Sequence, residues 1–510
     1  MLAAAIVATA IFSFGAVKVG EWSAAPEKEK DCLLRDPGLP ETGKPVELTV
    51  PMPDSFAFVQ SGGYLNDASC LNRTPIYGVV APKNEDEIRQ TLRFASENHL
   101  PVAMAGAHHS MGGQSIAQNG IVLDMNDFDE IVVNQEGMTM RVQSGATWGE
   151  IQQQLDPLGL SVKAMQSINI FSVGGTLSVN AHGIAHDPGQ VAPTVRSMRI
   201  MLADGSVVTA SREQNEELFR HVLGGYGLFG VILDADLDVV QNEVYGREDV
   251  YVDYKDFSEY FTTYIDGNPR DGLFYARLSV APQSYLREVA VHQYARTKPD
   301  EDPQPLHPET HNGFLRFVVN FSKTGSLGRW TRWMLEKYLQ PFVFPSVISR
   351  NQAMFDSMTY LKNNLNDTDI LQEYFVPHDQ FAAFVDGLRE TVRKNDANLL
   401  NATIRIVHAD QDTAMPYAPE GRFAVVLYFN VSLDESKYQD QLAALDKTTN
   451  ELIDLSTSLR GSFYLPYRLT YSSEQLRMAY PATDAFFETK QTYDPAGLFQ
   501  NAFSNTYGPR

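Results

Sequence analysis

Cysteine is scarce in this chain, and no metal-binding pattern is present. The 510 residues include two cysteines, Cys32 and Cys70, and neither has the spacing of a zinc ligand set. No cluster of cysteine and histidine elsewhere suggests a metal ion, so we expect none. In an oxidising compartment Cys32 and Cys70 could pair; the alternative is two unpaired thiols.

Basic residues are also few. The chain has 41 Lys and Arg against 63 Asp and Glu, which gives a net charge of -22. A nucleic-acid-binding surface needs clustered Lys and Arg, so we expect no nucleic-acid partner. The hydrophobic fraction of 43% and the aromatic fraction of 11% are typical of a well-cored globular enzyme.

The N-terminus is largely apolar from Leu2 to Val17, and Lys18 follows it. This run suits the core of a secretory signal and is short for a membrane-spanning helix, which needs about 20 residues. No Lys or Arg precedes it, so the signal pattern is incomplete, and a buried strand is the alternative. We predict a signal peptide or membrane anchor over residues 1–25, a charged tether over 26–69, and an exported or membrane-anchored protein.

A glycine-rich loop is the most informative stretch. Residues 102–115 read Val-Ala-Met-Ala-Gly-Ala-His-His-Ser-Met-Gly-Gly-Gln-Ser, after a strand from Pro101 to Ala105 and before another from Ile121 to Asp124. Small residues let backbone N–H groups approach a ligand and converge on an anion such as a pyrophosphate. The alternative is a surface turn with two solvated histidines.

Two more segments are rich in small residues. Ser167 to Gly183 holds a glycine pair and a histidine, and it suits packing against a flat ligand or a tight helix-to-sheet contact. Gly225 to Gly230 fits the Gly-x-Gly-x-x-Gly pattern. It follows a predicted helix and precedes a strand, however, which is the reverse of the context that a Rossmann fingerprint needs.

Local signals predict several elements of the first half. Asn84 with Glu87, and Thr147 with Glu150, are the pairs that cap helix N-termini. Asp204-Gly205 predicts a hairpin turn. Near residue 243 the composition shifts towards aromatic residues, with strands alternating with long helices, so we predict a domain boundary there. Arg405, in an alternating strand, could face a substrate or form a structural ion pair.

Four motifs occur together in a fixed order. They are Gly106-Ala-His-His-Ser110 with Gly112-Gly113-Gln114-Ser115, then Ser172 to Gly183, then Gly224 to Gly230, and finally Tyr493-Asp-Pro-Ala-Gly-Leu-Phe-Gln-Asn501. This set resembles the vanillyl-alcohol oxidase / p-cresol methylhydroxylase (PCMH-type) flavoprotein superfamily. The resemblance implies an α+β fold with two FAD-binding subdomains built from both chain ends and a mid-chain α+β cap domain. The implied bounds are 70–242 for the FAD domain, 243–460 for the cap and 461–510 for the returning segment.

The resemblance also implies FAD as cofactor and assigns its contacts. His109 matches the histidine that many members bond to the flavin, and the absence of cysteine between Lys163 and Gly183 excludes a second, cysteinyl bond. The implied FAD-binding positions are Ala105, Gly106, Ala107, His108, His109, Ser110, Met111, Gly112, Gly113, Ser167, Ser172, Val173, Gly174, Gly175, Ser178, Val179, Asn180, His182, Gly183, Val231 and Tyr464.

Within the superfamily, the Leu371–Pro377 and Arg405 strands resemble aldonolactone and alditol oxidases, and Tyr464-Leu465 also resembles decaprenylphosphoryl-ribose oxidases. The implied reaction is oxidation of a CH–OH group of a sugar, aldonolactone or polyol, with hydride transfer to flavin N5 and oxygen or a quinone as electron acceptor. Arg405 and Arg468 are candidates for charge or orientation, and Glu373 and Tyr467 for taking the proton. Two departures are Tyr467 where relatives have Lys, and Thr403 where alditol oxidases have Glu.

Two other functions stay open from the sequence. One is a lipid-linked sugar oxidase with non-covalent FAD that works in an epimerisation pathway, which the apolar N-terminus suits. The other is a flavin-fold binding protein that has lost its chemistry, which only the two departures support.

Overall fold

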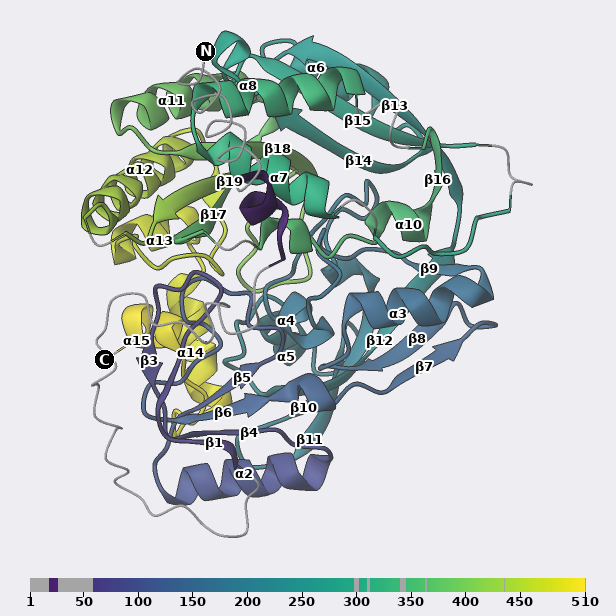
Figure 1. The fold of residues 1–510 in the computed structure, drawn as a ribbon. Helices are drawn as coiled ribbons and strands as arrows, with labels where there is room; N and C mark the ends of the chain where they lie inside the picture. Colours follow the sequence, from purple (N-terminus) through teal and green to yellow (C-terminus); the bar gives the residue numbers. More distant parts are fainter. Residues whose placement is uncertain are drawn as a thin grey trace.

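The computed structural model describes residues 18–25, 58–297, 302–309, 312–339, 345–362, 365–434 and 436–509. Two halves are stacked on each other (Figure 1). The lower half is built from the first part of the chain and from its C-terminal helices, and the upper half from the middle of the chain. This α+β arrangement, in which the C-terminal segment joins the same half as residues 58–242, is the predicted fold.

The lower half contains two sheets. The first has the strand order β1 (Phe58–Ser61), β4 (Gly78–Val80), β6 (Ile121–Asp124) and β5 (Val102–Ala105), with β6 parallel to both of its neighbours. The second has the order β11 (Val207–Ser211), β10 (Val195–Met201), β12 (Val231–Gln241), β8 (Thr139–Gln143) and β7 (Ile131–Asn134), and β9 (Leu160–Val162) pairs with β12. A short ribbon pairs β2 (Tyr64–Leu65) with β3 (Thr74–Pro75).

Two helices of the lower half begin where the capping pairs predict. Asn84 caps α2 (Glu85–Glu97) by accepting the Glu87 N–H, and Thr147 with Glu150 forms a reciprocal capping box on α3 (Trp148–Leu155). The other helices here are α4 (Val173–Ser178), α5 (Glu216–Val222), α14 (Thr483–Tyr493) and α15 (Ala502–Tyr507). The predicted hairpin across Asp204-Gly205 is also confirmed, because β10 and β11 pair antiparallel around it.

The upper half, the cap, is built on one eight-stranded sheet. Its order is β16 (Val347–Ser349), β13 (Val244–Asp253), β15 (Glu288–Arg296), β14 (Asp271–Leu278), β18 (Leu399–Val407), β19 (Arg422–Ser432), β17 (Asp367–Pro377) and β20 (Ser462–Phe463). The long helices α11 (Phe381–Lys394) and α12 (Tyr438–Ser458) pack against β17. The remaining cap helices are α6 (Phe257–Tyr264), α7 (Asn312–Lys323), α8 (Ser326–Met334), α10 (Arg350–Met354) and α13 (Ser473–Ala479), and a π-helical turn spans Leu335–Leu339.

The C-terminal segment returns to the lower half beside β5. The Val102 N–H donates to the Leu498 carbonyl at 2.8 Å, and the Gln500 N–H donates to the Val102 carbonyl at 3.0 Å. Asn501 caps α15 and donates its side-chain amide to the Tyr226 carbonyl at 2.8 Å. The closing motif therefore fastens the chain end to the glycine turn at 224–230.

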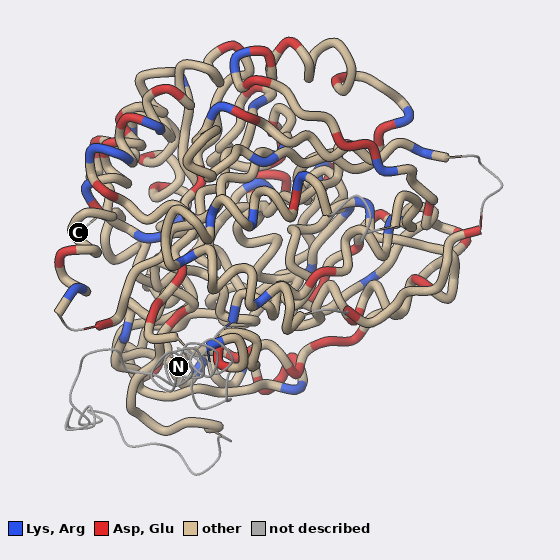
Figure 2. The backbone as a smooth tube through the Cα atoms, turned by 45° about the horizontal axis from the view of Figure 1, so that its top comes forward, with Lys and Arg blue, Asp and Glu red and all other residues tan. Residues whose placement is uncertain are grey.

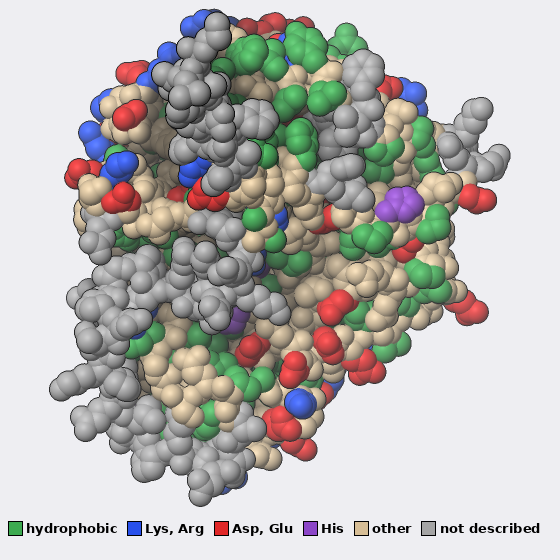
Figure 3. All heavy atoms as spheres, viewed as in Figure 1, with side chains coloured by type: hydrophobic (Ala, Val, Ile, Leu, Met, Phe, Trp, Pro, Cys, Tyr) green, Lys and Arg blue, Asp and Glu red, His purple; other side chains and the backbone are tan. Residues whose placement is uncertain are grey.

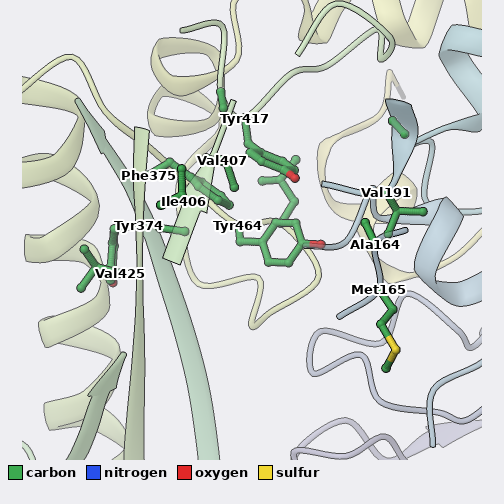
Figure 4. Close-up of a cluster of buried hydrophobic side chains, with 14 of the residues drawn as sticks. Ala164, Met165, Val191, Tyr374, Phe375, Ile406, Val407, Tyr417, Val425 and Tyr464 are labelled. Carbon is green, nitrogen blue, oxygen red and sulfur yellow. The ribbon is translucent and has the colours of Figure 1, made fainter. Parts of the chain in front are cut away.

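An aromatic cluster joins the two halves. Phe375 and Tyr417 of the cap stack with ring centroids 4.1 Å apart, and Tyr464 meets both rings edge-on. Figure 4 shows Tyr464 between these cap residues and the side of the lower half that carries Ala164 and Met165. The tyrosine donates its hydroxyl to the Val179 carbonyl at 2.9 Å, so one residue bridges both halves.

The N-terminal predictions meet the structure only in part. The whole apolar run from Leu2 to Val17 lies outside the described residues, as does Cys32, so the signal, the anchor and the cysteine pairing stay predictions. Within the predicted tether of 26–69, Phe58–Ser61 and Tyr64–Leu65 form β1 and β2. The cap sheet extends slightly past its predicted end to include Ser462–Phe463. Within the described ranges, no helix is long and apolar enough to span a bilayer.

Candidate functional site

A cavity of about 920 Å³ lies where the two halves meet. The lower half supplies the glycine loop after β5, the 165–184 segment with α4, and the turn at 226–232. The cap supplies side chains of β13, β14, β15, β17, β18 and β19, together with α7, α8 and the loop after α10. The cavity therefore has two walls of different origin.

The wall of the lower half depends on a close approach of two loops. A Cβ atom at Gly106 would lie 2.1 Å from the Ser172 Oγ, which is closer than real Cβ contacts. Ser172 is the N-cap of α4 and accepts the Gly175 N–H. Because no side chain fits between these loops, backbone groups of both face the cavity.

Unpartnered polar atoms show that this wall fits a polar ligand. The Ser115, Ser144 and Ser167 hydroxyls line the cavity and are buried with no hydrogen-bond partner in the described structure, and the same holds for His108 Nδ1. Buried hydroxyls without partners are uncommon in folded proteins and suggest atoms that a ligand satisfies. The donors and the size of the cavity fit FAD.

Most of the predicted FAD contacts line this cavity. They are Ala105, Gly106, Ala107, His108, His109, Ser110, Ser167, Ser172, Gly174, Gly175, Ser178, Val179, His182, Val231 and Tyr464. The histidine-bearing loop is held from several sides: the His109 ring lies 4.2 Å from the Phe171 ring, and His108 has a left-handed backbone with φ of 54°. Burial lowers the pKa of His108, which favours its neutral form.

Six predicted contacts lie behind the wall and support it. The Met111 sulfur accepts the Leu371 N–H. The backbone N–H groups of Gly112 and Gly113 donate to the side chains of Gln114 and Asp67, and the Asn180 side chain donates to Asp410. Val173 lies in the core, and Gly183 packs against the Met165 carbonyl. These positions are structural in this chain. All six residues are buried, and their partners come from other segments, which the motifs themselves do not show.

A buried polar cluster joins the two walls. His182 Nε2 lies 2.6 Å from Glu373 Oε1, and both side chains are almost fully buried. The Tyr467 hydroxyl donates to Glu373 Oε2 at 3.3 Å. Arg405 Nη1 lies 3.5 Å from the His182 carbonyl, and its buried Nε has no partner among the described residues.

The ionisation of Tyr467 is set by this environment. Burial raises the pKa of Tyr467 well above its ordinary value, the Glu373 carboxylate raises it further, and Arg405 opposes both. Tyr467 is therefore a hydrogen-bond donor at neutral pH and not a base. Glu373 and His182 are the groups of this cluster that can take a proton.

Arg468 differs from the prediction. It forms an ion pair with Asp446 of α12 and does not line the cavity. Adjacent residues in this loop point to opposite sides, so Tyr467 reaches the cavity and Arg468 cannot. Arg468 is therefore not among the predicted catalytic residues that the structure brings together at the cavity.

The cap wall carries charged groups that the sequence did not single out. Arg277 pairs with Glu336 at 2.9 Å and donates to Asn401, and Arg247 forms a bidentate pair with Asp249. Arg332 donates to the Leu400 carbonyl at 3.2 Å and has no carboxylate within 4.0 Å in the described part of the chain. These arginines come from separate elements, so no local motif marks them.

Burial also shifts the pKa values of charged side chains in the cap wall. It lowers the pKa of Arg332 to about 10, so the guanidinium remains charged at neutral pH. Burial opposes ionisation of Glu336, but Arg277 and His292 lower the pKa of Glu336 to about 2. Among the described residues, Arg332 and Arg405 thus present guanidiniums without a carboxylate partner to the cavity, beside several polar and aromatic groups. The other acidic lining residues, Glu309 and Asp356, hold Ser357 and Met358.

Comparisons with known proteins agree with the flavin assignment. A family described as FAD binding domain matches residues 76–211. Cytokinin dehydrogenase 1 of Arabidopsis thaliana is 31% identical over 477 residues, which cover 85% of this chain and 80% of the relative. Cytokinin dehydrogenase 2 of the same plant is 30% identical over 161 residues, 31% of this chain and 32% of the relative. An uncharacterized oxidoreductase, ORF5 in the fasciation locus of Rhodococcoides fascians, is 31% identical over 176 residues, 33% and 38% of the two chains. The matches to these last two relatives span less than two fifths of their length.

Proposed function

Because this chain belongs to the FAD-linked oxidoreductases of the PCMH-type flavoprotein superfamily, we propose that it oxidises a CH–OH group of a sugar, aldonolactone or polyol. The observation that carries the proposal is the Glu373–His182 pair with Tyr467 and Arg405 at the junction of the two cavity walls. Alcohol oxidation needs a proton acceptor beside a hydride acceptor, and this cluster supplies the first.

FAD supplies the hydride acceptor when it is bound. The residues of the chain act on the hydroxyl group: the Glu373–His182 pair takes its proton, and Tyr467 holds the Glu373 carboxylate in place through its hydroxyl. Arg405 is the cation next to this cluster and orients the substrate oxygen. It also favours the negative charge that builds up on that oxygen as the proton leaves.

The cap wall supports a substrate with several hydroxyl groups. Asn401, Thr403, Tyr428 and the Arg277 and Arg332 guanidiniums line the same compartment, so it offers donors and acceptors over a wide surface. A polyol or sugar satisfies such groups, whereas a purely apolar substrate would leave them buried without partners.

We also propose that FAD is bonded to His109, with oxygen or a quinone as electron acceptor and an extracytoplasmic location. Its place on the cavity-lining loop supports this assignment of His109.

Acid precipitation tests the bond between FAD and His109: flavin should stay with the protein pellet, and peptide mapping should place it on His109. His109→Ala should release the flavin, whereas His108→Ala should keep it bonded. Free FAD in the supernatant of the wild type would overturn the bond and favour the lipid-linked, non-covalent alternative.

The proposed reaction is tested by anaerobic flavin reduction with a panel of polyols, aldoses, aldonolactones and a cytokinin. Bleaching of the flavin by one of the first three classes supports the proposal.

A second candidate, cytokinin oxidation, is favoured by the name of the relative that matches 85% of the chain. Bleaching by the cytokinin alone would replace the proposal with it. A folded, flavin-loaded protein that no member of the panel reduces would favour the non-catalytic alternative.

A further inference from the structure

The cap exposes several large apolar side chains on one side. Leu327 is 67% exposed, Tyr338 62%, Phe314 52% and Trp330 45%. They belong to α7, α8 and the π-helical turn after α8, and we call this surface the α7–α8 face. Figure 3 shows hydrophobic side chains, in green, gathered at the top of the molecule over these helices. Monomeric soluble proteins rarely leave such a group uncovered.

The charge pattern of this face differs from that of the rest of the chain. No Asp or Glu occurs between residues 310 and 335, although the chain has 63 of them. The charged residues there are Arg316, Lys323, Arg329 and Arg332. Elsewhere, acidic and basic residues are mixed along the backbone (Figure 2).

The N-terminal segment is fixed on the same face. The Trp22 ring lies 6.1 Å from the rings of Phe317 and Phe321 on α7. Asn320 donates to the Trp22 carbonyl and Arg316 to the Ser23 carbonyl, both at 3.0 Å. The apolar stretch of the sequence up to Val17 therefore precedes a segment that α7 holds in place.

The mouth of the cavity opens beside this surface. Phe314, Leu315, Leu335 and Leu339 line the cavity, and Phe314 and Leu339 are also exposed at the surface. A partner that covers the face would thus lie next to the entrance.

We propose that the α7–α8 face docks on a lipid bilayer, because its apolar side chains are exposed and the segment held on α7 directly follows the apolar sequence of residues 2–17. Amphipathic helices bind bilayers when an apolar face with aromatic and leucine side chains meets the boundary between headgroups and acyl chains. The one acidic residue of these elements, Glu336 in the π-helical turn, is buried and pairs with Arg277, so no exposed carboxylate of α7, α8 or this turn opposes the contact. Because the net charge of the whole chain is -22, binding depends on apolar burial and not on anionic lipids.

Flotation of the full-length flavoprotein with neutral phosphatidylcholine vesicles tests the proposal. The wild type should float with the vesicles at both low and high salt. The double substitution Leu327→Gln and Trp330→Gln, outside the cavity lining, should lower partitioning at least about tenfold, which is about 1.4 kcal/mol. The control pair Val132→Gln and Met478→Gln removes exposed apolar side chains elsewhere and should partition like the wild type. Flavin content and melting temperature verify that each variant is folded.

A second measurement needs only a conservative change. Lipids brominated in their acyl chains should quench the fluorescence of the wild type on vesicle binding. Trp330→Phe should clearly reduce that quenching, with Trp22 on the same face accounting for the remainder. The proposal would be overturned if the wild type did not float, or if the double variant floated as well as the wild type. It would also be overturned if Trp330 fluorescence were not quenched by the brominated lipids. Self-association that the double variant abolishes, without vesicle binding, would assign the face to a second copy instead. None of these readouts depends on the substrate.

Discussion

The two walls of the cavity are built on different principles. The lower wall consists of small residues, backbone groups and the buried hydroxyls of Ser115, Ser144 and Ser167, which belong to continuous loops. The cap wall consists of long charged and aromatic side chains such as Arg277 and Arg332, which come from separate strands and helices. A wall of backbone groups tolerates no added atoms, whereas a wall of side chains can change its chemistry one residue at a time. Cofactor binding is therefore tied to the loops, and substrate choice to the cap.

The largest expected effect tests the lower wall. Gly106→Val should abolish flavin binding, because even a Cβ atom there would lie 2.1 Å from Ser172 Oγ. The absorbance ratio of flavin to protein measures it. Gly421→Ala is the control, because its Cβ would meet only the edge of His378 at 3.6 Å. Normal flavin content in Gly106→Val would show that the loops carrying Gly106 and Ser172 can move apart. The lower wall would then tolerate added atoms, contrary to the difference drawn between the two walls.

The next effect tests the cluster between the walls. Glu373→Gln keeps the shape of the side chain but removes its ability to take a proton, so the rate of flavin reduction should fall about 10²- to 10⁴-fold at unchanged flavin content. Stopped-flow absorbance measures the rate. Arg468→Gln serves as the neighbouring control and should reduce flavin at close to the wild-type rate, since Arg468 is paired with Asp446 outside the cavity. Equal loss in both variants would contradict the assignment.

Asp356 gives a pH-dependent effect at the junction of the halves. Burial raises the pKa of Asp356 from 3.8 to about 6, so its proton is bound more tightly in the folded state. Its contribution favours folding at low pH and is lost as the pH rises through 6, by about 3 kcal/mol. The stability of the wild type relative to Asp356→Asn should therefore fall between pH 4 and pH 7 in denaturant titrations. The exposed control Asp129→Asn should show no such trend, and a flat difference for Asp356→Asn would refute the prediction.

The smallest effect tests the cap wall, and it rests on the proposed sugar or polyol substrate. Arg332→Gln should raise KM about tenfold with little change in kcat, because the guanidinium contacts substrate far from the reacting carbon. Arg332→Lys should recover part of the loss. Arg270→Gln, exposed on the same half, should leave KM unchanged. A fall in kcat alone would place Arg332 outside the substrate compartment.

Local signals in the sequence were sufficient to predict several helices and turns of the lower half. Asn84 and Thr147 mark helix starts because capping depends on residues three positions apart. The glycine loop was found because the need for small residues is visible in the sequence itself. The same motif includes Met111, Gly112 and Gly113, which do not line the cavity, since a loop reverses direction within a few residues and motifs do not record which side each residue faces.

The sequence by itself determined the capped helices, the hairpin, the loop that faces FAD and the return of the chain end to the first half. Each of these depends on neighbouring residues or on an ordered set of motifs. Only the tertiary structure decided that Glu373 meets His182, that Arg468 pairs with Asp446, and that Arg332 has no carboxylate partner among the described residues. Such contacts join side chains from distant elements, and their geometry follows from how the cap sheet packs on the lower half, which no local pattern encodes.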